Sequence, residues 1–144
     1  MSRVLVIGCG GVASVAIHKI CQVSDVFTDL CIASRTVSKC DVLAEELKGN
    51  TKTNITTAKV DADNTDEVIA LINKFKPDVV LNVALPYQDL TIMDACLACK
   101  VPYVDTANYE CEDTDNPEWR KVYEERCKRL GFTAYFDYSW PVSY

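Results

Sequence analysis

Three small residues near the start of the chain have the spacing of a dinucleotide-binding turn. Gly8, Gly10 and Ala13 form the pattern G-x-G-x-x-A between the apolar run Val4–Ile7 and a segment with helical periodicity. In such a turn Gly8 allows a sharp bend, Gly10 lets a pyrophosphate approach the backbone, and Ala13 lets the helix pack on the strand. A purely structural glycine turn is the alternative, and the position between a strand and a helix favours the dinucleotide site, with helix N–H groups facing the anion.

A second group of candidate binding residues consists of Ser34, Arg35 and Thr36, which follow the short apolar run Leu30–Ala33. In dinucleotide-binding folds this strand end usually carries an acidic residue that binds the ribose 2′-hydroxyl, and here the acid is replaced by arginine. A guanidinium can pair with a 2′-phosphate through two hydrogen bonds, and the two hydroxyls add further donors. The sequence therefore predicts NADP in preference to NAD. Lys39 adds positive charge nearby or is an ordinary exposed helix lysine.

Three later strand ends supply further candidates. Asp61 follows the third expected strand and either accepts from the adenine amino group or belongs to an ordinary polar loop. After the fourth strand come Ala84, Leu85 and Pro86, whose backbone is expected to line the ribose and nicotinamide, because ligands bind at the carboxyl edge of a parallel sheet. Asp105 begins a polar stretch after the fifth strand, which favours either substrate contact or a simple loop-tying role.

The eight cysteines and the single histidine raise the question of a metal or redox centre. Most cysteines fall inside expected strands and helices, as small apolar residues do, and not in the loop-rich spacing of a disulfide scaffold. Cys96 and Cys99 form a C-x-x-C within an apolar helix, without a second such pair or a nearby histidine, so packing is favoured over zinc binding. His18 lies on the polar row of a helix, which is typical of a solvent-facing histidine. We expect no metal site.

The composition bounds the class of protein. The chain has 144 residues, 49% of them hydrophobic, which fits one globular domain with a real core. A net charge of −6 and an isoelectric point near 4.7 argue against nucleic-acid binding. The first residues predict a strand and not a signal peptide, and no apolar run approaches the length of a membrane span. We therefore expect a cytoplasmic protein that binds neither nucleic acid nor membrane.

Five apolar runs alternate with helical segments, which predicts a doubly wound parallel α/β sheet of the Rossmann type, with strand order 3-2-1-4-5. The expected strands are residues 4–7, 30–33, 55–60, 79–83 and 101–104. In the first helix, the face expected to pack on the sheet consists of Val12, Val15, Ala16, Ile20 and Val23. Ser38 and Thr65 are the expected N-caps of the second and third helices.

The C-terminal part contains one more predicted helix and an aromatic tail. Asn116 and Pro117 form a helix start, and Gly131 ends that helix. Residues 132–144 are rich in Tyr, Phe and Trp without helical spacing, so they are expected to be covered by something, since dense exposed aromatics mark a contact surface. We therefore divide the chain into a dinucleotide-binding domain, residues 1–131, and an aromatic tail, residues 132–144, which leads to a substrate domain absent from this chain.

Taken together, four stretches resemble the cofactor domain of the saccharopine dehydrogenase family. They are VLVIGCGGVA at 4–13, ASRT at 33–36, DVVLNVALPYQD at 78–89 and VPYVDTANYE at 101–110. The resemblance covers nearly the whole chain, and YFDYSW at 135–140 is similar to a stretch in the branch of the family that works on polyamines. That branch joins aspartate semialdehyde to a diamine as an imine and reduces it with NADPH.

The resemblance also implies roles for individual residues. The pyrophosphate would be held by Gly8, Gly10, Gly11 and Val12, the 2′-phosphate by Ser34, Arg35 and Thr36, and the nicotinamide half by Ala84, Leu85 and Pro86. Tyr87 and Asp105 would face the amine or aldehyde substrate. The chemistry would be that of an NADP-dependent oxidoreductase acting on a CH–NH bond, with the protein orienting cofactor and substrate.

The family continues into a substrate-binding domain that this sequence lacks, and residues 141–144 depart from the family pattern. We therefore expect a cofactor domain that folds and binds NADP but does not turn over substrate alone. The competing hypothesis is a non-catalytic NADP-binding module that senses redox state or mediates protein contacts. The aromatic tail favours a lost partner domain or a homodimer interface.

Overall fold

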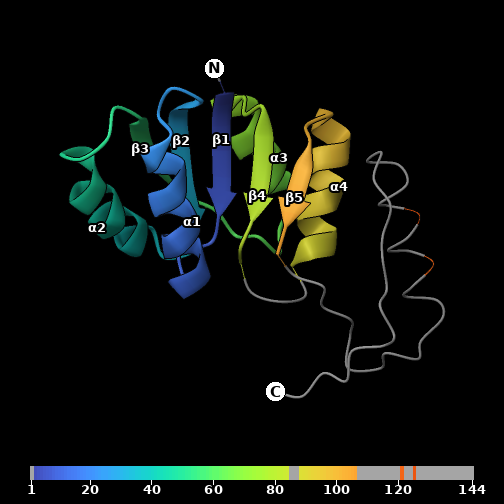
Figure 1. Ribbon diagram of the computed structural model, residues 1–144. Helices are drawn as coiled ribbons and strands as arrows, with labels where there is room; N and C mark the ends of the chain where they lie inside the picture. Colours follow the sequence, from blue (N-terminus) through green and yellow to red (C-terminus); the bar gives the residue numbers. More distant parts are fainter. Residues whose placement is uncertain (1, 85–87, 107–120, 122–124, 126–144) are drawn as a thin grey trace, which may run out of the picture.

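The computed structural model describes residues 2–84, 88–106, 121 and 125. These residues form one five-stranded sheet with the order β3-β2-β1-β4-β5, in which every neighbouring pair is parallel (Figure 1). The strands are β1 Ser2–Ile7, β2 Phe27–Ser34, β3 Asn54–Lys59, β4 Val79–Asn82 and β5 Tyr103–Asp105. The helices are α1 Gly11–Gln22, α2 Val37–Lys48, α3 Thr65–Phe75 and α4 Asp89–Cys99. The predicted fold class and strand order are confirmed.

Helices cover both faces of the sheet, and the side chains of β1 alternate between the two. Val4 and Val6 pack with α1 and α2, whereas Leu5 and Ile7 pack with α3 and α4. Figure 1 shows α1 and α2 in front of the sheet and α3 and α4 behind it. Because both faces are covered, the central strands contain unbroken apolar runs, Val4–Ile7 in β1 and Leu30–Ala33 in β2, as their sequence indicated. Because all five strands are parallel, their carboxyl ends lie at one edge of the sheet, and the two buried clusters hold the strands together.

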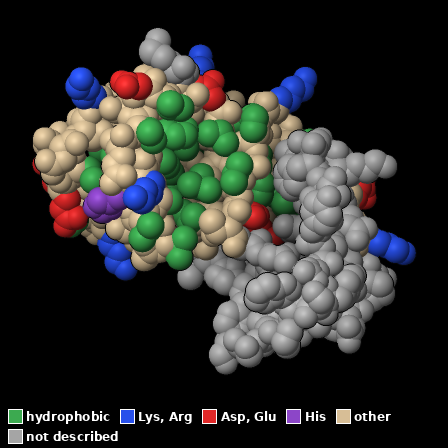
Figure 2. Space-filling view, viewed as in Figure 1, with side chains coloured by type: hydrophobic (Ala, Val, Ile, Leu, Met, Phe, Trp, Pro, Cys, Tyr) green, Lys and Arg blue, Asp and Glu red, His purple; other side chains and the backbone are tan. Residues whose placement is uncertain are grey.

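The predicted packing face of α1 is wrong for Val12, Val15 and Val23 and right for Ile20. The helix buries Ala13, Ile17, Ile20 and Cys21, while Val12 and Val15 are 62% and 63% exposed. Apolar residues occupy so many positions of α1 that two overlapping stripes have helical spacing, and the stripe that begins at small Ala13 lies against the sheet. Figure 2 shows the outward hydrophobic side chains gathered over this side of the molecule.

Several element boundaries also differ from the sequence-based expectations. Helix α2 begins one residue after Thr36, so Ser38 lies inside it, and Asn64 caps α3 in place of Thr65. The Asn64 side chain accepts hydrogen bonds from the backbone N–H groups of Asp66 and Glu67, which its neighbour could not do from within the helix. Strand β5 starts only at Tyr103, because the backbone N–H groups of Lys100 and Val101 donate to carbonyl groups at the end of α4.

Some expectations lie outside the described residues. They concern Leu85, Pro86, Tyr87, the predicted helix from Asn116 to Gly131, and the aromatic tail. Within the part of the chain that the structure describes, no helix is both long and apolar enough to cross a membrane.

Candidate functional site

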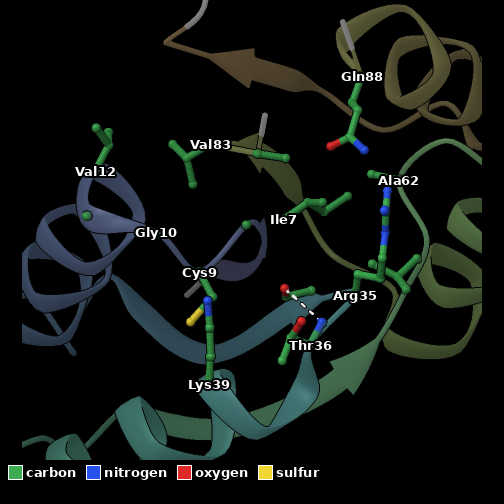
Figure 3. Close-up of a pocket in the computed structure, with 15 residues that line it drawn as sticks. Ile7, Cys9, Gly10, Val12, Arg35, Thr36, Lys39, Ala62, Val83 and Gln88 are labelled. Atoms are coloured by element: carbon green, nitrogen blue, oxygen red, sulfur yellow. Dashed lines mark hydrogen bonds between the residues drawn. The ribbon is translucent and has the colours of Figure 1, made fainter. Parts of the chain in front are cut away.

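A cavity of about 470 Å³ opens at the carboxyl edge of the sheet, where β1 has β2 on one side and β4 on the other. Its volume is within the range of small-molecule sites. The lining residues come from the loops after β1, β2, β3 and β4 and from the starts of α1, α2 and α4 (Figure 3). The predicted site residues among them are Gly8, Gly10, Gly11, Val12, Ser34, Arg35, Thr36 and Ala84. The fold thus brings predicted site residues as far apart in sequence as Gly8 and Ala84 together in one cavity.

The glycines of the turn meet different surroundings. Gly8 has a φ of +120°, and a Cβ there would lie 2.5 Å from the Val83 carbonyl oxygen and 2.8 Å from the Ala84 nitrogen. Only glycine therefore permits the close contact between the turn and the end of β4. A Cβ at Gly10 or Gly11 would meet nothing within 4 Å. These two positions keep the backbone N–H groups at the start of α1 open to the cavity.

Of the three helices whose starts line this cavity, α1 and α2 lack both a capping side chain and an acidic residue in the first turn. Gly10 of α1 and Thr36 of α2 make no side-chain cap hydrogen bond, and neither helix has an acidic residue in its first turn. By contrast, α3 is capped by Asn64 and carries two acidic residues in its first turn. Unpaired N–H groups and the positive end of the helix dipole favour an anion. The starts of α1 and α2 are therefore suited to phosphate groups.

Arg35 lies at the mouth of the cavity and contacts two carboxylates from the loop after β3. Its guanidinium nitrogen is 2.9 Å from the Asp63 carboxylate and 3.5 Å from that of Asp61. All three side chains are substantially exposed, so these ion pairs are weak and a stronger anion can replace them. Asp61 itself does not line the cavity, in contrast to its neighbours Val60 and Ala62.

The other residues at the end of β2 and the start of α2 supply hydroxyl groups and a further positive charge. The Ser34 hydroxyl oxygen accepts a hydrogen bond of 3.2 Å from the Thr36 backbone N–H, which shapes the start of α2. Lys39, in the first turn of α2, also lines the cavity, as Figure 3 shows. Arg35 and Lys39 thus add two cations to the lining of the cavity.

Gln88 is a cavity residue that sequence reasoning missed. It stands at the N-cap of α4, is buried, and its Nε2 donates to the Asp63 carboxylate across 3.1 Å. The same carboxylate oxygen accepts from Arg35, so Asp63 links the β2 end to the start of α4. No sequence pattern signalled this contact, because it joins loops that are 25 residues apart.

Asp105 lies at the end of β5 in a buried hydrogen-bond network. The Tyr103 hydroxyl donates to the Asp105 carboxylate across 2.7 Å and accepts from Asn82 Nδ2 across 3.0 Å. The Asn82 side-chain oxygen in turn accepts from the Ala84 backbone N–H. Burial, together with the nearby Asp105 carboxylate, raises the pKa of Tyr103 well above its ordinary value. The network therefore fixes Asp105 relative to the cavity-lining backbone at Ala84.

The thiols of the C-x-x-C pair are placed as packing residues. Cys96 is fully buried between α4 and the sheet, and burial raises its pKa to about 12. Among the described residues, no cluster of three or more histidine, cysteine, aspartate or glutamate side chains could hold a metal ion. His18 is exposed on α1, with Nδ1 2.7 Å from the Ser14 carbonyl oxygen.

A parallel sheet with a glycine turn and two open helix starts at its switch point defines a Rossmann-type dinucleotide-binding domain. Residues 4–134 match the family described as the saccharopine dehydrogenase NADP binding domain. The chain therefore belongs to the saccharopine dehydrogenase family, and the predicted family resemblance is confirmed.

Two curated relatives have the same region at moderate identity. A carboxyaminopropylagmatine dehydrogenase from Synechocystis is 45% identical over 136 residues, which cover 93% of this chain and 33% of the relative. A carboxynorspermidine synthase from Vibrio cholerae is 34% identical over 144 residues, covering 91% of this chain and 34% of the relative. The chain thus spans about one third of the length of these relatives.

Solved structures of low sequence identity share the fold. Saccharopine dehydrogenase from Saccharomyces cerevisiae superposes with a TM-score of 0.69 at 19% identity, covering 92% of this chain and 26% of the yeast enzyme. Shikimate dehydrogenase from Mycobacterium tuberculosis has a TM-score of 0.58 at 17% identity and covers 91% of this chain and 44% of that enzyme.

Proposed function

We propose that this chain is the cofactor domain of an NADPH-dependent reductase that converts an imine to a secondary amine. The observation that carries the proposal is the pair of cations, Arg35 and Lys39, beside two uncapped helix starts in one cavity. NADP differs from NAD by a 2′-phosphate, and an arginine at the end of β2 suits that group better than it suits a ribose hydroxyl.

In this proposal, different residues around the cavity bind different parts of the cofactor. The pyrophosphate binds at Gly8, Gly10, Gly11 and Val12, where the start of α1 offers free N–H groups. The 2′-phosphate binds to Arg35 with support from Ser34, Thr36 and Lys39. Ala84, with Leu85 and Pro86 after it, contacts the nicotinamide half. Asp61, which does not line the cavity, helps to hold Arg35 in this arrangement.

When bound, NADPH supplies the hydride that reduces the imine carbon. The contribution of this chain is to hold the cofactor at the carboxyl edge, next to the ends of β4 and β5. In the proposed complex, Asp105, which Tyr103 fixes at the end of β5, and Tyr87 face the substrate. A carboxylate there suits the positively charged amine substrate that forms the imine.

The relatives indicate the class of amine. One is named for a carboxyaminopropyl group on agmatine and the other for carboxynorspermidine. Both names describe the product expected when an amine condenses with aspartate semialdehyde and the imine is reduced. We therefore propose aspartate semialdehyde as the aldehyde and either a diamine, as in carboxynorspermidine dehydrogenase, or agmatine as the amine.

The reaction is tested with the full-length gene product. Oxidation of NADPH is followed at 340 nm with aspartate semialdehyde and, separately, agmatine, 1,3-diaminopropane and putrescine. The proposal predicts oxidation that requires both the aldehyde and one of the amines. Equal rates with aldehyde alone would contradict imine reduction, and the same assay with residues 1–144 alone should show no substrate-dependent oxidation.

A further inference from the structure

Gln88 is a buried amide side chain that reaches the cofactor cavity from the start of α4. It is only 8% exposed, it lines the cavity, and its Nε2 group donates to the Asp63 carboxylate across 3.1 Å. Although Gln88 stands at the N-cap of α4, its side chain makes no cap hydrogen bond. None of the residues that the structure describes donates a hydrogen bond to its Oε1 oxygen. Gln88 therefore brings to the cavity wall an acceptor that no described residue occupies.

The contact with Asp63 fixes which end of the Gln88 amide faces the cavity. A carboxylate oxygen accepts hydrogen bonds and does not donate them, so the group that meets Asp63 is the NH₂ of the amide. Figure 3 shows the amide nitrogen on the side of Arg35 and the amide oxygen on the side of Val83. At this point the wall selects a hydrogen-bond donor of the ligand, and a phosphate oxygen, which is an acceptor, does not fit.

The surroundings of Gln88 suit the adenine ring of a dinucleotide. Val60 and Ala62, on either side of Asp61, are buried and line the same cavity, so they give the ring an apolar wall. Arg35, the residue proposed to bind the 2′-phosphate, donates to the same Asp63 oxygen as Gln88, so the two side chains are close together. The ribose that carries the 2′-phosphate also carries the adenine. The base should therefore lie within reach of Gln88.

We propose that the Oε1 oxygen of Gln88 accepts a hydrogen bond from the 6-amino group of adenine. Asp63 is then the positioning residue that holds the amide in the required orientation. This inference rests on the proposed function, because it places NADP in the cavity. Gln88 takes the role that the sequence indicated for Asp61, which is not among the residues that line the cavity.

A dinucleotide with a different base tests this contact. The probe is reduced nicotinamide hypoxanthine dinucleotide phosphate, which keeps the 2′-phosphate and has a carbonyl oxygen in place of the adenine amino group. The Oε1 oxygen would then face a second acceptor, so calorimetric titration of this chain should show binding at least fivefold weaker than that of NADPH. Equal affinities would overturn the inference and leave the proposed function intact. If neither nucleotide binds, the proposed function fails, and the inference fails with it.

Variants assign the discrimination to Gln88 and Asp63. Gln88→Met keeps the length of the side chain and removes the acceptor, so the ratio of the two affinities should fall to about one. An indirect effect through Arg35 would change both affinities alike, because both nucleotides carry the 2′-phosphate. Asp63→Ala frees the amide to turn its NH₂ group toward the hypoxanthine oxygen, so the ratio should fall at least twofold.

The control is Gln22→Met, which makes the same change at the far end of α1 and should leave the ratio of affinities unchanged. A ratio of fivefold or more that survives Gln88→Met would contradict the assignment of the adenine contact to Gln88. A ratio that falls in Gln88→Met and stays at the unmodified value in Asp63→Ala would overturn the positioning role of Asp63.

Discussion

The guanidinium of Arg35 and the carboxylate of Asp63 meet across 2.9 Å at the mouth of the cofactor cavity, although the residues are 28 positions apart. The same Asp63 oxygen accepts from Gln88, so one acidic side chain connects the end of β2 with the start of α4. Asp63 and a 2′-phosphate would compete for the same guanidinium. If the proposed function is right, the loop after β3 tunes the affinity for NADP.

Asp63→Asn should tighten NADPH binding about threefold to tenfold, because it removes a negative charge and a weak exposed ion pair beside the 2′-phosphate. NADH, which lacks that phosphate, should bind with unchanged affinity. Calorimetric titration of both nucleotides measures the difference. Asp25→Asn, which makes the same charge change in the loop before β2, serves as the control. Weaker NADPH binding by Asp63→Asn would show that Asp63 orients Arg35 for the phosphate.

Gly8→Ala and Gly10→Ala should separate folding from binding. The Gly8 Cβ would collide with the backbone of Val83 and Ala84 in a positive-φ conformation, so we expect a loss of stability of about 2–5 kcal/mol. A Cβ at Gly10 meets open space and an ordinary φ of −96°, so stability should change by less than about 1 kcal/mol.

Gly10→Ala, the variant that should keep its stability, should lose affinity for the cofactor. Gly10→Ala places a methyl group where the pyrophosphate approaches, so NADPH affinity should fall at least tenfold in a fully folded protein. Thermal unfolding and titration of the same samples give both quantities. Normal NADPH affinity in Gly10→Ala would show that the pyrophosphate does not approach this backbone.

Tyr103→Phe should destabilise the domain by about 1–3 kcal/mol, because Asn82 and Asp105 each lose a buried hydrogen-bond partner. Urea unfolding measures the change. Thr57→Val, which removes an exposed hydrogen bond to Asp41, should cost less than about 0.5 kcal/mol. Equal effects of the two variants would mean that the buried network does not stabilise the ends of β4 and β5.

The buried Cys96 thiol should make the domain less stable in alkali. Its pKa is raised from 9.0 to about 12, so the folded protein keeps a proton that the unfolded chain releases above pH 9. Stability is therefore full below pH 9 and falls as the pH rises toward 12, by about 2 kcal/mol at pH 10.5 from this group.

The Cys96 effect is measured as the difference in unfolding free energy between pH 8 and pH 10.5. Cys96→Ala should show a smaller difference than the unmodified protein, whatever its absolute stability. Cys40 contributes in the same direction and remains in the variant, so part of the dependence should persist. An unchanged difference would mean that Cys96 titrates as freely in the folded state as in the unfolded chain.

The parts of the site that follow from local sequence were predictable. The strand–turn–helix pattern around Gly8 and the alternation of apolar runs with helices were sufficient for the fold and strand order. Parallel strand ends must meet at one edge, so the arrival of Arg35 and Ala84 beside the glycine turn followed from topology alone.

The remaining features depend on distances between loops. The contacts of Asp63 with Arg35 and Gln88, and of Asn82 with Tyr103, join residues 21 or more positions apart and have no local sequence signature. The packing face of α1 was predicted wrongly for a different reason. Its apolar residues allowed two faces, and only the close packing of Ala13 on the sheet distinguishes them.

Titration of this chain with NADPH and NADH, repeated for Arg35→Ala, shows whether Arg35 selects NADP. We expect NADPH to bind at least tenfold more tightly than NADH, a difference of about 1.4 kcal/mol. Arg35→Ala should remove that preference while leaving NADH affinity unchanged. Equal affinities in the unmodified protein, or a preference that survives Arg35→Ala, would contradict the assignment.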